Sequence, residues 1–371
     1  MKNVLGLINL NESEEYVTEI TKHRPLAAVP FGGRYRLIDF VLSSMVNSGI
    51  QNVGILLRHK HRSLMDHLRS GKEWDLARKY EGLFILPPAP GMCFGENSRA
   101  DIENFYHHLN YLANCRQKYV LITGSNMICN INYHRAFKFH QDMQADITIL
   151  YKENNEENDC LQGTLLEVEP DGRVVDIAIH PPTMTGNKIS MEMYIMERTL
   201  LMDLIAGCNA RGGSDLVKDG FIKHLAKLKV YGYQHKGYLA RIHSIKSYYR
   251  HNMELLKSEK WQDLFFKSGP VYTKVKDEAP VKYKEGAKVS NTMIANGCII
   301  EGRVENSVLF RGVKVSKGAY IKDSIIMQKT IIAENAIVEN VICDKDVQIT
   351  SGKWLKGDKN FPLVVEKGTV I

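Results

Sequence analysis

A basic stretch near the N-terminus carries side chains suited to binding an anion. It surrounds the glycine pair Gly32-Gly33 with Lys22, His23, Arg24, Arg34 and Arg36. Glycine lets the backbone approach a ligand closely, and cations beside an open turn favour phosphate groups. A second basic cluster follows at residues 58–62. The candidate anion-binding residues are Lys22, Arg24, Arg34, Arg36, Arg58 and Lys60, and the alternative for each is a solvated or interface position.

A polar turn follows the first predicted strand, residues 4–8. In a nucleotide-binding α/β fold this turn is rich in glycine, so that backbone N–H groups can contact phosphates. Here the turn, residues 9–16, has no glycine and contains three glutamates, Glu12, Glu14 and Glu15. Their side chains block a close approach and repel a triphosphate. Asn11 or Ser13 before these glutamates is instead typical of a helix N-cap.

Apolar runs alternate with helical patterns over the first 257 residues. The runs predict buried strands at 4–8, 53–57, 119–123, 145–151, 165–168 and 174–179. After the glycine turn, apolar residues at helical spacing predict a buried helix: Ile38, Val41, Leu42, Met45 and Val46. Asp215 is a suitable N-cap for a later helix. We therefore expect an α/β domain with a mixed, mostly parallel sheet at residues 1–257, and a polar linker at 258–285.

The C-terminal segment, residues 286–371, repeats with a period of six. Small or aliphatic residues recur at this step, namely Val313, Ala319, Ile325, Ile331, Ile337 and Cys343, and Val315 and Ile321 add a second stripe. An antiparallel sheet would alternate at two and would not keep such a step. The period predicts a left-handed parallel β-helix of roughly five coils, in which each hexapeptide forms one face of a triangular coil.

Charge and composition exclude some classes of function. The net charge of +7 is spread along 371 residues, without the Lys/Arg block that is typical of nucleic-acid binding. No apolar run approaches the ~18 residues of a membrane span, and the N-terminus leads directly into a strand, so we expect no signal peptide. The seven cysteines have no CxxC spacing and read as reduced thiols rather than disulfides or a zinc site. We expect a cytoplasmic protein that binds neither nucleic acid nor membrane.

The stretch around the glycine turn resembles a family signature. Residues 29–40 read Val-Pro-Phe-Gly-Gly-Arg-Tyr-Arg-Leu-Ile-Asp-Phe, and residues 47–50 read Asn-Ser-Gly-Ile. This pattern resembles that of the ADP-glucose pyrophosphorylases (glucose-1-phosphate adenylyltransferases) of glycogen and starch synthesis, and the resemblance extends over essentially the whole chain. It implies a Rossmann-like nucleotidyltransferase domain followed by the β-helix. The reaction that it implies joins ATP and glucose 1-phosphate to give ADP-glucose and diphosphate.

The resemblance also marks where the chain departs from the catalytic pattern. Catalytic members carry a Gly-Gly-x-Gly-Thr-Arg-Leu-type loop where this chain has residues 9–16. Counting back from Tyr133 places Asn126 on one metal-binding aspartate, and Arg241 falls on the second. Because Mg²⁺ prefers carboxylate oxygens, neither replacement suits it. The resemblance therefore implies no intact catalytic residue and no metal in this chain, with Asn126 and Arg241 as vestigial positions.

The sugar-phosphate pocket that the resemblance implies is altered as well. Its vestigial positions are Ser98, Thr164, His180 and Ser190. Ser98 stands in place of a glycine, and His180 in place of the lysine that pairs with the phosphate. Ser190 is retained, but Glu192 replaces a glycine two residues later. A glutamate that points at a sugar phosphate would repel it.

Together these losses imply a regulatory, catalytically impaired subunit in glycogen biosynthesis, similar to the GlgD-type partners of this family. It would assemble with a catalytic subunit as a heterotetramer, or form homo-oligomers when alone, and the catalytic partner would bind Mg²⁺. The cations named above would then bind a sugar-phosphate or nucleotide effector. One alternative is an active sugar-phosphate nucleotidyltransferase with a rearranged site. Another is a hexapeptide-repeat acyltransferase, which the lack of any histidine after His251 disfavours.

Overall fold

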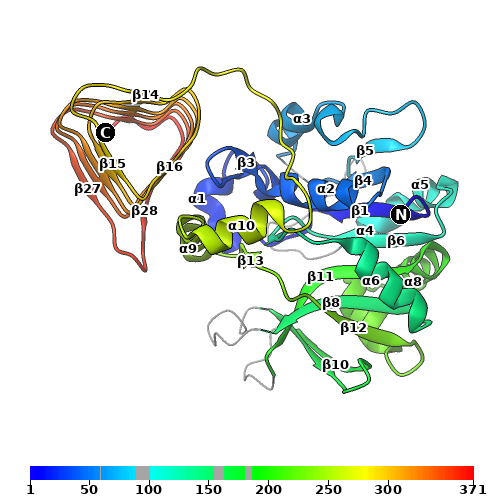
Figure 1. Ribbon diagram of the computed structural model, residues 1–371. Helices are drawn as coiled ribbons and strands as arrows, with labels where there is room; N and C mark the ends of the chain where they lie inside the picture. The colour runs from blue at the N-terminus through cyan, green and yellow to red at the C-terminus, as the bar shows by residue number, and fades with distance from the viewer. Residues whose placement is uncertain (59, 89–100, 154–162, 180–185) are drawn as a thin grey trace.

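The computed structural model describes residues 1–58, 60–88, 101–153, 163–179 and 186–371, which form an α/β domain and a triangular β-helix side by side (Figure 1). The first domain is built on a nine-stranded sheet with the order β10-β9-β11-β6-β1-β4-β5, and β8 pairs with β11 and β12. Its strands are β1 (Val4–Asn9), β4 (Asn52–Leu56), β5 (Gly82–Leu86), β6 (Tyr119–Thr123), β8 (Ile147–Glu153), β9 (Thr164–Val168), β10 (Val174–Ile179), β11 (Lys188–Glu197) and β12 (Val230–Gln234).

Parallel pairing in the middle of this sheet brings several strand ends to one edge. β1 pairs in parallel with β4 on one side and with β6 on the other, and β4 pairs in parallel with β5. β11 runs antiparallel to both β6 and β8, so the sheet is mixed. The predicted sheet is therefore confirmed, and the segments that follow β1 and β6 lie next to each other.

Helices cover both faces of the sheet, and the strands supply a core to each. In β1, Val4 and Ile8 contribute to one core, while Leu5 and Leu7 contribute to the other. The helical segments are η1 (Glu15–Val17), α1 (Thr18–Thr21), η2 (Leu26–Ala28), α2 (Leu37–Asn47), α3 (Arg62–Leu68), η3 (Lys72–Trp74), α4 (Ile102–His107), α5 (Leu109–Asn114), α6 (Tyr133–Asp142), α8 (Arg198–Ala210), η4 (Leu216–Phe221), η5 (Ile222–His224), α9 (Ile245–Glu254) and α10 (Ser258–Phe266).

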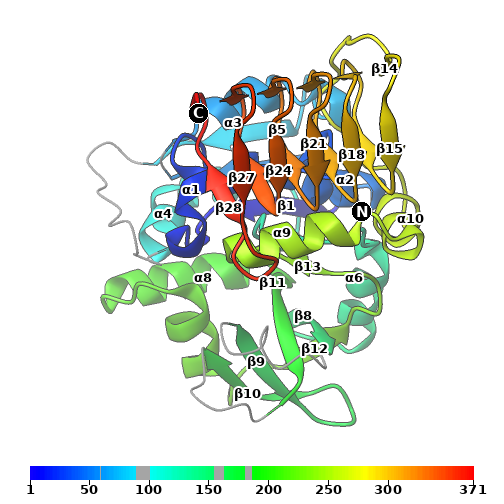
Figure 2. The same cartoon turned by 90° about the vertical axis from the view of Figure 1, so that its left-hand side faces the viewer.

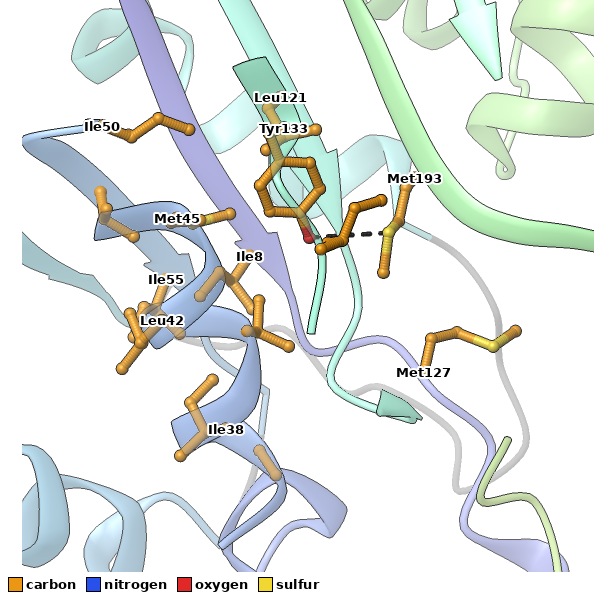
Figure 3. Close-up of a cluster of buried hydrophobic side chains, with 14 of the residues drawn as sticks. Ile8, Ile38, Leu42, Met45, Ile50, Ile55, Leu121, Met127, Tyr133 and Met193 are labelled. Carbon is orange, nitrogen blue, oxygen red and sulfur yellow. Dashed lines mark hydrogen bonds between the residues drawn. The ribbon is translucent and has the colours of Figure 1, made fainter. Parts of the chain in front are cut away.

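The predicted helix after the glycine turn is α2, and it lies in the centre of one core. Ile38, Leu42 and Met45 pack from α2 towards Ile8 of β1 (Figure 3). The same figure shows the Tyr133 hydroxyl at 3.6 Å from the sulfur of Met193, a contact between α6 and β11. α2 therefore fixes the position of the glycine turn against the sheet.

The C-terminal domain is a left-handed β-helix with three parallel sheets of five strands each (Figure 2). The first sheet contains β14 (Lys282–Tyr283), β17 (Ile299–Ile300), β20 (Lys314–Val315), β23 (Ile331–Ile332) and β26 (Gln348–Ile349). The second contains β15 (Lys288–Ser290), β18 (Arg303–Glu305), β21 (Tyr320–Lys322), β24 (Ile337–Glu339) and β27 (Trp354–Lys356). The third contains β16 (Met293–Ile294), β19 (Val308–Leu309), β22 (Ile325–Ile326), β25 (Val341–Cys343) and β28 (Leu363–Val365). The predicted architecture is confirmed.

The register inside the β-helix differs from a strict step of six. Val315 pairs with Ile332, and Ile332 pairs with Ile349, so these coils contain 17 residues rather than 18. Each coil therefore shifts the buried position by one residue relative to the 18 residues of three hexapeptides. As a result Ile332 is buried in the interior, whereas Ile331 is only half-buried.

The segment between the domains contains regular structure at both ends. Within residues 258–285, α10 packs Leu264 and Phe265 against the first domain, and β14 already pairs with β17 of the β-helix. A hydrophobic core joins the domains directly, since Phe31 and Tyr248 share it with Val308 and Phe310. The β-helix is thus packed firmly on the glycine turn and on α9 (Figure 1).

Two further sequence predictions concern membranes and cysteines. Among the helices of the described segments, none has the length and apolar character of a membrane span. The cysteines in those segments, at positions 115, 129, 208, 298 and 343, are free thiols.

Candidate functional site

A cavity of about 400 Å³ opens at the carboxyl ends of β1 and β6. The turn after β1 forms one wall, and the segment after β6 forms the floor. Glu192 enters from β11, and Arg241 enters from β13 (Ala240–Arg241). Small-molecule sites of parallel α/β sheets are found at this edge. The fold therefore preserves the place where a nucleotide-binding site is expected.

The glycine-free turn after β1 places a carboxylate in the cavity wall. Glu12 accepts hydrogen bonds from the backbone N–H of Ser125 and from its hydroxyl, the latter at 2.8 Å. Burial raises the pKa of Glu12, and the charge of Glu192 adds to this effect. The N–H group of Ser125, at the carboxyl end of β6, therefore binds a side chain of the protein itself.

The predicted N-cap in this turn is wrong. The helical segment begins at η1, and the residue before it, Glu14, makes no capping hydrogen bond with its side chain. The Glu14 carboxylate instead accepts a hydrogen bond of 2.8 Å from the backbone of Leu26. Ser13 lies 3.5 Å from the amide of Glu15, at the limit of a hydrogen bond. Contacts with distant segments, which no local pattern reveals, determine this turn.

Asn126 and Arg241, the residues expected at the metal positions, lie in adjacent segments. β13 pairs with β7 (Met127–Ile128), so that Arg241 lies opposite Met127, and the amide of Ile242 donates to the backbone oxygen of Asn126 at 2.9 Å. Asn126 is 7% exposed, and its side-chain oxygen has no hydrogen-bond partner among the described residues. Arg241 is 8% exposed. A neutral amide and a guanidinium do not fit Mg²⁺, which requires carboxylate oxygens here.

Five carboxyl groups border the cavity among the residues that the structure describes. They belong to Glu12, Glu15, Asp101, Glu192 and Asp215. Within the described parts of the chain, no group of three or more His, Cys, Asp or Glu side chains is arranged to hold a metal ion.

Asp101 also lines the cavity, and the sequence alone did not indicate that its pKa would be raised. Its carboxyl accepts hydrogen bonds from the amide of Leu216 at 2.9 Å and from the side chain of Asn9 at 3.3 Å. Burial, together with the nearby charge of Asp215, raises the pKa of Asp101 to about 8. The side chain of Asp215 accepts a 2.7 Å hydrogen bond from the backbone amide of Lys218, which confirms Asp215 as an N-cap.

Two of the four residues expected in a sugar-phosphate pocket, Thr164 and Ser190, lie within the described segments. Thr164 lines the cavity, and the hydroxyl of Ser190 accepts a hydrogen bond of 3.1 Å from the amide of Glu192. Glu192 has a φ of +55° at a bulge in β11. This left-handed conformation suits glycine better than a residue with a side chain. Ser98 and His180 lie outside the described residues.

The six candidate anion-binding residues fall into two groups. Arg58 and Lys60 lie beside the first turn: Lys60 contacts Glu14 at 3.3 Å, and Arg58 is buried facing the charges of Glu12 and Glu14. The other four lie near the junction of the domains or on the glycine turn. Arg58 and Lys60 therefore balance the charge of the glutamates in this turn.

The second group faces the β-helix. Lys22 forms an exposed ion pair of 2.6 Å with Glu366, and Arg24 forms a buried one with Asp344. Arg36 donates to the backbone oxygen of Ser63 at 2.7 Å, and burial lowers its pKa to about 10. Arg34 is exposed, with its guanidinium 5.5 Å from the ring centroid of Tyr35.

Cations of the linker and β-helix join this second group, and sequence reasoning missed them. Burial, together with the charges of Arg36 and Arg24, lowers the pKa of Lys345 to about 6. Lys276 and Arg311 are also close enough for their charges to interact with Arg36 and Arg34 respectively, and burial lowers the pKa of both. These residues lie far from Arg24 in the sequence, so only the folded chain brings them together.

Comparison with known proteins gives two matching family models. A model described as "Nucleotidyl transferase" matches residues 17–264, and one described as "GlmU-like, C-terminal hexapeptide" matches residues 278–362. The chain is 40% identical to "Glycogen biosynthesis protein GlgD" of Bacillus subtilis (strain 168), over 99% of this chain and 96% of that protein. It is 42% identical to the protein of the same name from Geobacillus stearothermophilus, over 99% and 97%. A "Glucose-1-phosphate adenylyltransferase" of Bacillus mycoides (strain KBAB4) is 32% identical, over 94% and 93%.

Proposed function

Because this chain belongs to the ADP-glucose pyrophosphorylase (glucose-1-phosphate adenylyltransferase) family of glycogen biosynthesis, we propose that it is a regulatory subunit with impaired catalysis. It would act by assembling with a catalytic subunit, as a heterotetramer, in the cytoplasm. The observation that carries this proposal is the pair Asn126 and Arg241, which border the cavity where two carboxylates would have to bind Mg²⁺.

The turn after β1 supports the same proposal. Nucleotidyl transfer needs open backbone N–H groups that meet the phosphates of ATP. Here the backbone N–H of Ser125 already donates a hydrogen bond to the carboxylate of Glu12. Arg58 and Lys60 balance the negative charge of the glutamates in this turn. A triphosphate would therefore have to displace internal hydrogen bonds and approach several carboxylates. We expect this chain alone to have no activity, or very weak activity.

The cations at the domain junction support a regulatory role. Arg24, Arg36 and Lys345 lie together, with Asp344 as the acidic partner in direct contact with Arg24. Burial and the like charges of Arg36 and Arg24 lower the pKa of Lys345 to about 6, and a negative charge beside these groups would favour the protonated form of the lysine. An anionic effector such as a sugar phosphate or a nucleotide would supply that charge, and it would contact both domains at once. The binding energy of the effector could then change how the domains, and hence the subunits, pack.

The test is a reconstitution assay of ADP-glucose formation from ATP, glucose 1-phosphate and Mg²⁺. Three samples are compared: this chain, the catalytic subunit of the same organism, and the two mixed. We expect no rate above background from this chain alone, and a changed rate or effector response in the mixture. Rapid turnover by this chain alone would refute the proposal, as would a mixture that behaves as the sum of its parts.

A further inference from the structure

The cavity at the carboxyl ends of β1 and β6 remains open although its chemistry has changed. Its volume of about 400 Å³ lies within the range of small-molecule sites. Sites that lose their ligand need not keep such a space, because side chains of the core can fill it. The groups that border the cavity therefore indicate which class of molecule it can still accept.

Asn126 is the most informative of these groups. It borders the cavity, it is more than nine-tenths buried, and its side-chain oxygen has no hydrogen-bond partner among the described residues. Leaving a buried acceptor unpaired destabilises a protein. A ligand that donates a hydrogen bond to this oxygen would remove that cost.

The neighbours of Asn126 disfavour an anion. Glu192 and Asp215 border the same cavity. The backbone amide of Glu192 donates a hydrogen bond to the hydroxyl of Ser190, which holds Glu192 at the bulge of β11. Arg241 is the only arginine or lysine among the described residues that line the cavity. Among these described residues a phosphate would meet more carboxylates than cations, which is unfavourable in a partly enclosed site.

A metal ion or another small cation is disfavoured for a separate reason. The Glu12 carboxyl already accepts two hydrogen bonds from Ser125, and the Asp101 carboxyl accepts from Leu216 and Asn9. Burial raises the pKa of both carboxyl groups, so both bind a proton more readily than an exposed carboxyl does. These two carboxyl groups thus line the cavity as hydrogen-bonding groups of the protein itself and are poor ligands for a cation.

We infer that the cavity binds a neutral, hydroxyl-rich molecule, namely a mono- or disaccharide without a phosphate group, through a hydroxyl that donates to Asn126. A sugar hydroxyl both donates and accepts a hydrogen bond. This matches the amide of Asn126, the hydroxyl of Thr164 and the carboxyl groups around them. The inference goes beyond the proposed function, since it requires neither catalysis nor assembly.

The experiment is a titration of the full chain with D-glucose, maltose and glucose 1-phosphate, followed by ligand-observed NMR. We expect glucose or maltose to bind, and glucose 1-phosphate to bind at least about tenfold more weakly, because it must bring a charge next to Glu192. Asn126→Leu, which keeps the size of the side chain and removes the acceptor, should weaken sugar binding about tenfold. Asn360→Ala, on an exposed loop of the β-helix, should leave it unchanged.

Three results would overturn the inference. They are no binding of either neutral sugar, tighter binding of glucose 1-phosphate than of glucose, and equal sugar binding by the original chain and Asn126→Leu. Thr164→Val, a replacement of similar size at the same wall, gives a second reading if Asn126→Leu fails to fold. It should also weaken sugar binding, and unchanged binding by this variant would count against the inference.

Discussion

The buried ion pair between Arg24 and Asp344 offers a quantitative test of how the two domains are joined. The side chains are 4% and 1% exposed, and Asp344 also accepts a 2.7 Å hydrogen bond from the amide of Lys345. Asp344→Ala leaves Arg24 buried without its partner, beside Arg36 and Lys345. Removing one partner of a buried pair costs about 3–5 kcal/mol. We expect a loss of this size in the free energy of unfolding.

The matched control is the exposed pair between Lys22 and Glu366, which also links the domains. Glu366→Ala should cost no more than about 1 kcal/mol, because water and salt screen an exposed pair. The double variant Arg24→Met/Asp344→Leu replaces the buried pair by apolar groups and should recover most of the stability that Asp344→Ala loses. It separates the cost of an unpaired charge from the cost of lost packing.

The assay is urea unfolding followed by far-UV circular dichroism, with the midpoint and slope compared among the variants. Because the pair lies between two domains, a separate unfolding step of the β-helix in Asp344→Ala would also agree with the reasoning. If Asp344→Ala is no less stable than Glu366→Ala, the pair does not hold the domains together, and the proposed role of the junction fails with it.

Three further predictions follow from the cavity. Glu192→Gly should raise the free energy of unfolding by about 1 kcal/mol in urea unfolding, because it relieves a left-handed conformation at φ +55°; Glu192→Ala is the control and should give no such gain. Asp101 has a folded pKa near 8, above its value of 3.8 in the unfolded chain, so its ionisation reduces stability as the pH rises from about 4 to 8. Stability profiles between pH 5 and 8.5 should therefore be flatter for Asp101→Asn, and equal slopes would contradict the raised pKa. ATP with Mg²⁺ should not raise the melting temperature of this chain at concentrations that stabilise the catalytic subunit, and a comparable shift in both would mean that the cavity binds nucleotide.

The β-helix and the central sheet could be predicted because their patterns are local. A step of six residues identifies the coil, and continuous apolar runs such as residues 119–123 identify buried strands. The 17-residue coil could not be predicted at Ile331 and Ile337. Each has an apolar neighbour, Ile332 or Val338, and the sequence does not show which of the two faces the interior. The N-cap prediction for the turn that contains Ser13 is wrong for a related reason: Leu26 and Ser125, which donate hydrogen bonds to the glutamates of this turn, are distant from it in the sequence.

The candidate site divides in the same way. The sequence indicated Asn126 and Arg241 only through their place in a family pattern, and the pairing of β13 with β7 is the physical reason that they meet. The guanidinium of Arg58 is suited to binding an anion, yet the charges that act on it most strongly are those of Glu12 and Glu14 in a different segment. Lys345 carries no local signal at all, because its low pKa arises from burial beside Arg36 and Arg24. Long-range packing decided these cases, and periodicity does not report it.

The most direct test of the central claim uses the complex of this chain with a catalytic subunit that has been disabled. The metal-binding aspartates of the partner are replaced by asparagine, the complex is assembled, and ADP-glucose formation is measured with ATP, glucose 1-phosphate and Mg²⁺. The predicted result is no product, or product at a very weak rate only, because Asn126 and Arg241 cannot take over the role of the missing carboxylates. Rapid turnover by that complex would contradict this prediction, since the active site would then have to be the cavity of this chain.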